Sequence, residues 1–188
     1  MLVVGLGVQR CSGVQSGAQR HRNHSLSISF GFMRVCDVLA ASSVAVRVTL
    51  DNKQDALKYM IHLLDRRGVI EDVDKVQDEI FKRETLMSTG VGKGFAFPHA
   101  KTGAVQKPSG ALITLDHPIE YQSLDNQPVS IIFMLLGQEH AVGAHLRLLS
   151  RISRLMNSDE FRQKLLEARS PDEVLNLINE EETQKLDV

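Results

Sequence analysis

The chain has 188 residues, 43% of them hydrophobic, and a formal net charge of −1, which suits one folded domain with a sizeable core. It has no basic stripe with interleaved aromatic residues, and its aromatic content is 5%, so no nucleic-acid partner is expected. No apolar run approaches the roughly 20 residues needed to cross a bilayer, so no direct membrane insertion is expected either.

Residues 1–32 differ in composition from the rest of the chain. They are rich in Gly, Ser, Gln, Arg and His and contain no Asp or Glu. The apolar run from Met1 to Val8 is short, contains Gly and has no basic residue before it, which disfavours a cleaved signal peptide. We expect residues 1–32 to be a disordered tail, or upstream sequence translated before a start at Met33, and to lie outside the folded core.

Alternating strand-like and helix-like segments begin at Met33. Runs of β-branched or apolar residues predict strands, and apolar residues spaced by three and four predict helices. In chain order we expect a strand at 44–50, a helix at 51–67 with Asp51 as its N-cap, a helix at 72–84, strands at 95–97, 109–115 and 129–136, and helices at 144–157, 159–168 and 171–178. A folded domain is therefore predicted at 33–181, followed by a polar C-terminal tail at 182–188.

The alternation of strands and helices predicts an α/β fold with a mixed, largely parallel β-sheet and helices on both faces. The segment at 129–136 is almost wholly apolar, as expected for a central strand covered on both faces. In such sheets reactive groups gather at the strand ends. Candidate site residues are therefore expected there.

One stretch, Arg83 to Lys101, has the features of an anion-binding loop. It contains Ser88-Thr89-Gly90-Val91-Gly92-Lys93-Gly94, and its three glycines permit positive φ and close backbone approach. The backbone N–H groups of this loop, together with Lys93 and Arg83, are predicted to hold an anion. The alternative for Arg83 is a solvated charge at the end of a helix.

The same stretch ends in Pro98-His99. Pro98 fixes its own φ and lacks an N–H, so it predicts the end of a strand rather than its middle. His99 would then present its imidazole at the edge of the sheet, where it can act as a nucleophile near neutral pH. From this local pattern alone, an ordinary surface or hydrogen-bonded histidine is the more common interpretation.

The stretch resembles the active-site signature of the enzyme IIA domains of the bacterial phosphotransferase system, fructose/mannitol type (type 2). The nitrogen-regulatory IIA proteins belong to the same group. The matching segments are Arg83-Glu84, Ser88 to Gly94, Phe97-Pro98-His99, Asp125-Asn126-Gln127-Pro128-Val129 and His145-Leu146-Arg147-Leu148-Leu149. The Asp125 segment is nearest to the nitrogen-regulatory branch. The resemblance covers roughly Met33 to Glu181 and implies the same α/β fold.

The resemblance also implies a role for each matched residue. His99 falls on the family's phosphorylated histidine, and His145 on its second active-site histidine. His145 begins a predicted helix, and because helix N-termini favour anions it is expected, with Arg83, to stabilise the phosphoryl group. The implied phosphate-binding loop consists of Ser88, Thr89, Gly90, Gly92 and Gly94. Lys93 departs from the uncharged residue expected in the family's loop, and either adds charge near the phosphate or points to water.

Other chemistries fit the sequence less well. Gly92-Lys93 is not part of a P-loop, because the first Gly and the Ser/Thr after Lys are missing from their places. His140 and His145 are five residues apart, which does not place two metal ligands on one helical face. A phosphohistidine acceptor needs no metal of its own, so neither a metal nor a cofactor is expected. Cys11 and Cys36 make no disulfide framework, and we expect a cytoplasmic protein.

The sequence therefore predicts a phosphotransferase component that acts through a phosphohistidine intermediate. As a phosphoryl carrier, it would accept the phosphoryl group from the histidine phosphocarrier protein on His99 and pass it to a IIB domain for sugar uptake. The alternative is a nitrogen-regulatory IIA protein, in which phosphorylation of His99 controls binding to regulatory target proteins. A third interpretation, an interaction module without phosphorylation, is disfavoured by the presence of both His99 and His145.

Overall fold

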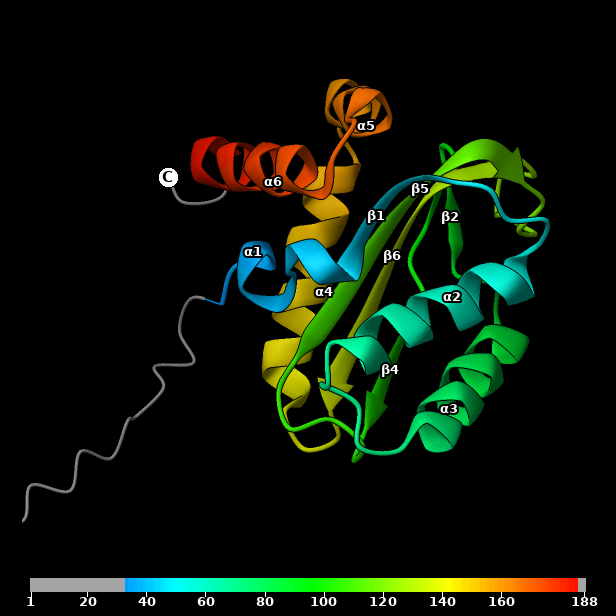
Figure 1. The fold of residues 1–188 in the computed structure, drawn as a ribbon, viewed down its shortest axis with the longest axis vertical. Helices are drawn as coiled ribbons and strands as arrows, with labels where there is room; N and C mark the ends of the chain where they lie inside the picture. Colours follow the sequence, from blue (N-terminus) through cyan, green and yellow to red (C-terminus); the bar gives the residue numbers. More distant parts are fainter. Residues whose placement is uncertain (1–32, 186–188) are drawn as a thin grey trace, which may run out of the picture.

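The computed structural model describes residues 33–185, which form a six-stranded sheet with helices on both faces (Figure 1). The strands are β1 (Val44–Val48), β2 (Gly90–Gly92), β3 (Phe95–Ala96), β4 (His99–Thr102), β5 (Ser109–Ile119) and β6 (Val129–Gln138). The helices are α1 (Val35–Val38), α2 (Lys53–Arg66), α3 (Val73–Leu86), α4 (Val142–Met156), α5 (Asp159–Glu167) and α6 (Pro171–Lys185), with a short 3-10 helix η1 (Ala41–Ser43). The predicted α/β class is confirmed.

The sheet is mixed and largely parallel, as predicted. Its strand order is β1-β5-β6-β3-β2, and β4 also pairs with β6. β1 is parallel to β5, and both β3 and β4 are parallel to β6. The β5–β6 and β2–β3 pairs are antiparallel. β3 and β4 therefore follow one another along the same side of β6.

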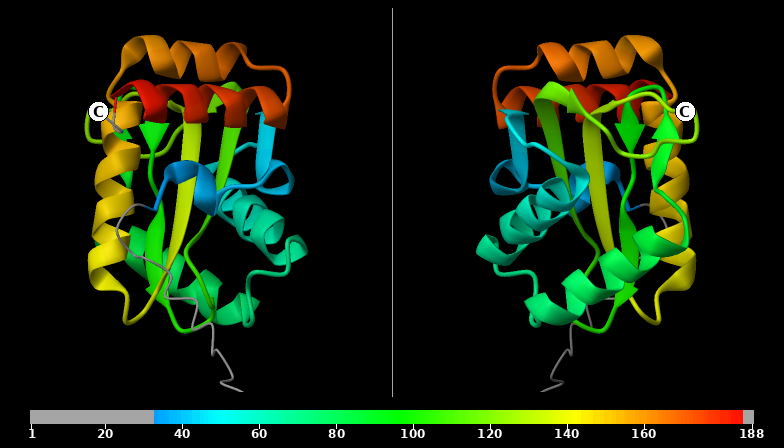
Figure 2. Two further views of the ribbon diagram at one scale, coloured as in Figure 1. Left: turned by 90° about the vertical axis from the view of Figure 1, so that its left-hand side faces the viewer. Right: turned by 90° about the vertical axis from the view of Figure 1, so that its right-hand side faces the viewer.

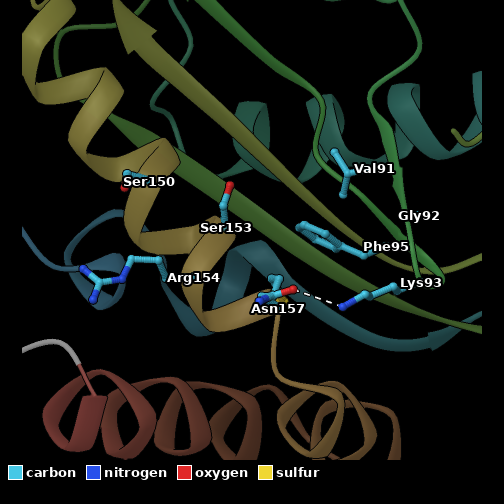
Figure 3. Close-up of a pocket in the computed structure, with 9 residues that line it drawn as sticks. Val91, Gly92, Lys93, Phe95, Ser150, Ser153, Arg154 and Asn157 are labelled. Carbon is cyan, nitrogen blue, oxygen red and sulfur yellow. Dashed lines mark hydrogen bonds between the residues drawn. The ribbon is translucent and has the colours of Figure 1, made fainter.

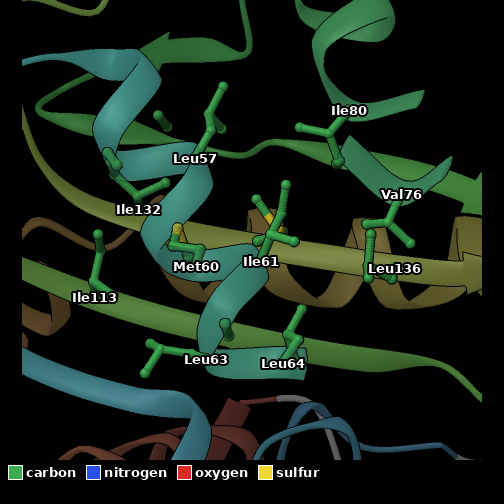
Figure 4. Packing of buried hydrophobic residues seen from close by; sticks show 14 of the residues in the cluster. Leu57, Met60, Ile61, Leu63, Leu64, Val76, Ile80, Ile113, Ile132 and Leu136 are labelled. Carbon is green, nitrogen blue, oxygen red and sulfur yellow. The ribbon is translucent and has the colours of Figure 1, made fainter. Parts of the chain in front are cut away.

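The two faces of the sheet carry separate apolar cores. Successive side chains of a strand point to opposite faces, so residues 132, 134 and 136 of β6 pack beneath α2 and α3, whereas residues 131, 133 and 135 pack against α4, α5 and α6. Figure 4 shows the first core, with Leu57, Met60 and Ile61 of α2 and Ile80 of α3 over the sheet. Burying each such side chain contributes roughly 1.5–3 kcal/mol. The prediction that β6 is a central strand covered on both faces is confirmed.

The helices begin at residues whose side chains cap them. Asn52, Asp72 and Ser158 accept hydrogen bonds from backbone N–H groups in the first turns of α2, α3 and α5. The prediction of Asp51 as the first N-cap is wrong by one residue, because it is the Asn52 side chain that reaches the N–H of Asp55. In Figure 2, α5 and α6 lie side by side near the top of the molecule, and α4 runs down one side. No helix within residues 33–185 is both long and apolar enough to span a membrane.

The last helix continues beyond its predicted end at residue 178. α6 runs to Lys185, so residues 182–185 are helical although a polar tail was predicted from residue 182. The reason is a buried polar contact that an apolar pattern cannot reveal. Glu182 is fully buried, and its carboxylate accepts hydrogen bonds from the N–H groups of Val35 (2.8 Å) and Cys36 (3.2 Å) at the start of α1. The predictions for residues 1–32 and 186–188 lie outside the described residues.

Candidate active site

His99 is the first residue of β4. The sequence predicts a strand at 95–97 that ends at Pro98 and leaves His99 at the sheet edge. In the structure β3 ends at Ala96, Pro98 marks an interruption, and the chain resumes pairing with β6 at His99, which lies opposite Leu135. The carbonyl of Pro98 accepts a hydrogen bond from the N–H of Leu135 (3.0 Å). His99 therefore stands at the start of a strand that, within residues 33–185, pairs with β6 alone, and this pairing fixes its backbone on one side.

The tautomer of His99 follows from one hydrogen bond. Its Nδ1 lies 2.8 Å from the backbone carbonyl oxygen of Phe97. A carbonyl oxygen can only accept, so Nδ1 carries the proton and donates it. The lone pair of the neutral ring then lies on Nε2. This is the nitrogen that can act as a nucleophile.

The surroundings of His99 favour its neutral form. Burial lowers its pKa below the ordinary value of 6.5, and the positive charge of Arg83 lowers it further. The hydrogen bond to Phe97 and the negative charge of Glu84 act in the opposite direction without reversing the shift. A half-buried, neutral imidazole with a fixed tautomer is suited to nucleophilic attack.

His145 lies beside His99. It belongs to the first turns of α4, where its N–H donates to the carbonyl of Ala141 (3.0 Å). The two ring centroids are 6.0 Å apart. The side chain is buried, and neither of its ring nitrogens has a hydrogen-bond partner within residues 33–185. Burial, and then the charges of His99 and Lys101, lower the pKa of His145 to about 4.

The buried position of His145 depends on a glycine. A Cβ atom added to Gly137, at the end of β6, would lie 2.2 Å from Nδ1 of His145. The imidazole therefore packs directly on the backbone of β6 in the space that a side chain would fill. The helix N-terminus that the sequence analysis invoked lies one turn before this ring, since α4 begins at Val142.

Arg83, on a third element, α3, lies in the same pocket as His99 and His145. It lies in the last turn of α3, and one guanidinium N–H donates to the carbonyl of Met87 (3.0 Å). Arg83, His99 and His145 line one open pocket of about 400 Å³. The structure thus brings together the three residues that the sequence predicted to act on a phosphoryl group.

The same pocket contains residues to which the sequence assigned no role. These are Glu79, Lys82, Leu86, Ala100, Lys101, Leu146 and Leu149. Two of them carry a signal that sequence reasoning offers. Lys101 is two residues after His99 on one strand, which places both on the same face. Glu79 lies four residues before Arg83 on one helix, which also places both on one face.

The predicted phosphate-binding loop lies elsewhere. Ser88, Thr89, Gly90, Gly92 and Gly94 do not line the pocket of His99. The N–H of Thr89 donates to Glu84, that of Gly90 to the Ser88 hydroxyl, and that of Lys93 to Asp125. These three amides are therefore already engaged within the chain. The binding of phosphate by this loop stays a prediction. The loop forms β2 and supports the strand that leads to His99.

Lys93 is exposed to solvent, as in the second of its two predicted alternatives, and it also makes a surface contact. Its ammonium donates to the side-chain oxygen of Asn157 (3.1 Å), the C-cap residue of α4 (Figure 3). Positive charge at a helix C-terminus is stabilising. Lys93 lines a second pocket between β2 and α4, together with Ser153 and Asn157, and it does not line the pocket of His99.

Comparison with known proteins assigns the chain to a family. Residues 37–181 match the family described as phosphoenolpyruvate-dependent sugar phosphotransferase system, EIIA 2. The match covers most of the chain, and the chain therefore belongs to this family. The resemblance stated from the sequence is confirmed.

Individual relatives include both kinds of protein that the sequence analysis considered. The chain is 35% identical over 148 residues to the fructose-specific EIIABC component of Bacillus subtilis, which covers 79% of this chain but only 23% of that protein. It is 35% identical over 128 residues to the fructose-specific EIIA component of Haloferax volcanii, covering 68% of this chain and 83% of the relative. Among solved structures, the nitrogen regulatory protein IIA-Ntr of Neisseria meningitidis superposes with a TM-score of 0.72 at 30% identity, covering 77% of this chain and 98% of that one.

Proposed function

We propose that this protein is a phosphoryl carrier whose His99 accepts a phosphoryl group on Nε2 from the histidine phosphocarrier protein and passes it to a IIB domain. The observation that carries the proposal is the hydrogen bond from Nδ1 to the carbonyl of Phe97, because it leaves the lone pair on Nε2. Membership of the EIIA 2 family supports the assignment. So does the shared pocket of His99, His145 and Arg83.

The transfer exchanges one P–N bond for another. The lone pair of Nε2 forms a bond to phosphorus while the P–N bond of the donor phosphohistidine breaks. The breaking bond's electron pair returns to the donor ring, which is protonated at its other nitrogen and leaves as a neutral imidazole. The His99 ring keeps its Nδ1 proton, shared with Phe97, and becomes positively charged. Passing the group to a IIB domain reverses these steps with a new acceptor.

Arg83 and His145 are suited to the moving phosphoryl group. In such a transfer the negative charge is spread over the equatorial oxygens, and positioned positive charge or N–H donors stabilise it. Arg83 brings a permanent positive charge to the pocket, and His145 brings a ring whose nitrogens have no partner within residues 33–185. An arriving phosphoryl group would supply the acceptor that a ring N–H of His145 lacks.

The rim of the pocket is suited to partner docking. Leu86 and Leu146 line the pocket, yet 77% and 59% of these side chains are exposed. Apolar surface beside a functional pocket is typical of a protein-binding site. Lys82 and Lys101 add positive charge to the same rim. We infer that the partner presents an apolar patch with acidic neighbours around its phosphohistidine.

The second candidate function is regulatory. The 30% identity to the Neisseria IIA-Ntr protein, and the Asp125 to Val129 segment, favour a protein whose phosphorylation state controls binding to target proteins. The same chemistry at His99 would serve both functions. Label that moves from this protein onto a IIB domain supports the carrier. Label that stays, while affinity for a regulatory target changes, supports the regulator.

The experiment follows labelled phosphoryl groups from the phosphorylated histidine phosphocarrier protein onto the purified chain. The parent protein should acquire an acid-labile, base-stable modification, and His99→Ala should acquire none while keeping its thermal stability. His117→Ala is the matched control, because the His117 side chain is 78% exposed and lies outside the pocket. Labelling of His99→Ala at the parental level would show that the site assignment is wrong.

A further inference from the structure

A buried polar network is connected to the backbone next to His99. We call it the Glu84 network, and it consists of Glu84, Lys53, Thr89 and Tyr121. Its centre is the buried carboxylate of Glu84 at the end of α3. Oε1 accepts a hydrogen bond from the N–H of Thr89 (2.8 Å) and pairs with the ammonium of Lys53 (2.6 Å). Oε2 accepts a hydrogen bond from the hydroxyl of Thr89 (2.6 Å). The network thus joins α2, α3 and the loop that leads into β2.

A buried tyrosine completes this network. The hydroxyls of Thr89 and Tyr121 lie 3.4 Å apart. Since the Thr89 hydroxyl donates its proton to Glu84, the Tyr121 hydroxyl is the donor in this contact. Burial, and then the charge of Glu84, raise the pKa of Tyr121, so it stays protonated. The ammonium of Lys53 lies 4.6 Å from the centre of the Tyr121 ring and also reaches its carbonyl (3.3 Å).

The network is connected to His99 through the backbone. The carbonyl of Thr89 accepts a hydrogen bond from the N–H of Phe97 (2.8 Å). The carbonyl of Phe97 accepts the Nδ1 proton of His99 (2.8 Å). Glu84 therefore fixes Thr89, Thr89 fixes the N–H side of Phe97, and the carbonyl of Phe97 sets the tautomer of His99.

Stability alone is a poor explanation for this arrangement. A buried ion pair costs several kcal/mol in desolvation for each ion, and apolar residues of similar volume are often as stable. Each oxygen of the Glu84 carboxylate is nevertheless occupied by a donor. A fully satisfied buried network of this kind rigidifies one local geometry.

We propose that Glu84 is a positioning residue for phosphoryl transfer, which holds Thr89 and Phe97 so that His99 keeps its proton on Nδ1 and its lone pair on Nε2. This inference rests on the proposed function for the meaning of the Nε2 lone pair. Glu84 also acts through its charge. The His99 ring becomes cationic when it accepts the phosphoryl group, and a fixed buried carboxylate nearby stabilises that cation.

Two substitutions separate geometry from charge. Glu84→Gln keeps the shape of the side chain and removes the charge. Thr89→Val keeps the backbone contacts and removes the hydroxyl, and Thr89→Ser is its conservative control. The readouts are the pKa and tautomer of His99, from nitrogen-detected NMR titration of the unphosphorylated protein, and the transfer rate measured beside the dissociation constant for the phosphocarrier protein.

The expected result is a split between transfer and docking. Glu84→Gln should lower the pKa of His99 and slow transfer by about tenfold or more, while the dissociation constant changes by less than about twofold. Thr89→Val should also lower the pKa of His99 and slow transfer. Thr89→Ser should keep both the pKa and the transfer rate near their parental values. If Glu84→Gln does not fold, the comparison of Thr89→Val with Thr89→Ser decides on the same readouts.

The opposing result is equally specific. Variants that lose thermal stability but keep the parental pKa and tautomer of His99 and the parental transfer rate would overturn the positioning role. If the parent accepts no phosphoryl group at all, the proposed function fails, and the NMR comparison still decides whether Glu84 sets the state of His99.

Discussion

The imidazole rings of His99 and His145 lie 6.0 Å apart, and burial lowers the pKa of both. The two rings come from different elements, β4 and α4, and face the same pocket. A proton on one ring makes protonation of the other more costly, because like charges repel at this distance. The surroundings of both rings therefore favour the neutral form.

The buried ring of His145 should make stability depend on pH. Its pKa is about 4 in the folded chain and roughly 6.5 in the unfolded chain. Between these values the unfolded state binds more protons, so stability is complete above about pH 6.5 and is lost as the pH falls towards 4. From about pH 7.5 to about pH 5 the expected loss is roughly 2 kcal/mol.

Denaturant unfolding of the parent, His145→Leu and His117→Leu at the two pH values measures this effect. His145→Leu should lose most of this pH dependence. His117→Leu, which replaces an exposed histidine, should keep it. Equal pH dependence in all three proteins would exclude His145 as its source.

Gly137 should be intolerant of a methyl group. An added Cβ would approach Nδ1 of His145 to 2.2 Å, and overpacking of this kind costs roughly 1–3 kcal/mol. Gly137→Ala should therefore displace the His145 ring, destabilise the fold and slow transfer. The matched control is Gly143→Ala, whose added carbon meets its nearest atom, on Arg147, at an ordinary 3.5 Å.

Thermal unfolding and transfer kinetics of the two glycine variants give the test. Gly143 lies in α4, where alanine is favoured over glycine by up to about 1 kcal/mol, so Gly143→Ala should be neutral or stabilising. A Gly137→Ala variant with parental stability and transfer rate would show that the ring relaxes without cost.

The strands β1, β3, β5 and β6 and the main site residues could be predicted because each depends on a local pattern. β2 and β4 were not predicted as strands, because they have only three and four residues and lie beside the glycine-rich loop and Pro98. β6 is apolar throughout, and its burial on both faces follows from that. His99, His145 and Arg83 were found through motifs whose order is preserved in the chain. The structure adds that three separate elements bring them to one pocket.

Several of the errors concern polar groups whose partners lie far away in sequence. Glu182 looks like part of a solvated tail until α1 supplies the two N–H groups it accepts. The amide of Lys93 looks free until Asp125 is placed beside it. Gly137 carries no motif, and its role depends on a ring eight residues further on. The spacing of apolar residues along the sequence predicts which of them are buried, but it does not predict which buried polar groups are paired.

Arg83 should contribute to transfer more than to docking. A charge-assisted hydrogen bond is worth roughly 1.5–3 kcal/mol, which corresponds to about ten- to a hundredfold in rate. Arg83→Ala should slow transfer by about that factor with little change in affinity for the unphosphorylated partner. Its transfer rate should also respond less to added salt, because one charge of the site is gone.

Lys93→Ala is the control for charge at a distance. It removes a cation that contacts Asn157 outside the pocket, so transfer should stay near the parental rate. Stopped-flow transfer and equilibrium binding on both variants give the comparison. If Arg83→Ala loses binding and transfer equally, Arg83 belongs to the docking surface. If Lys93→Ala slows transfer, the loop that contains Lys93 takes part in the active site.

Glu182 should stabilise the fold without taking part in transfer. Its carboxylate accepts hydrogen bonds from two N–H groups of α1 and pairs with Arg151 (3.2 Å). Removing one partner of a buried ion pair costs roughly 3–5 kcal/mol, so Glu182→Ala should lower the free energy of unfolding by that order. Glu180→Ala, an exposed neighbour on the same helix, should change it little.

Cys36 gives this prediction a local readout. Burial, and then the charge of Glu182, raise the pKa of its thiol to about 11, so reaction with a thiol reagent should be slow in the parent. In Glu182→Ala the start of α1 loses its acceptor, and labelling should become faster. A Cys11→Ser background removes the other cysteine of the chain.

Slow labelling and parental stability in Glu182→Ala would show that α1 is held by its apolar contacts alone. A loss of transfer in protein that is still folded would mean that the contact between α1 and α6 also influences the site.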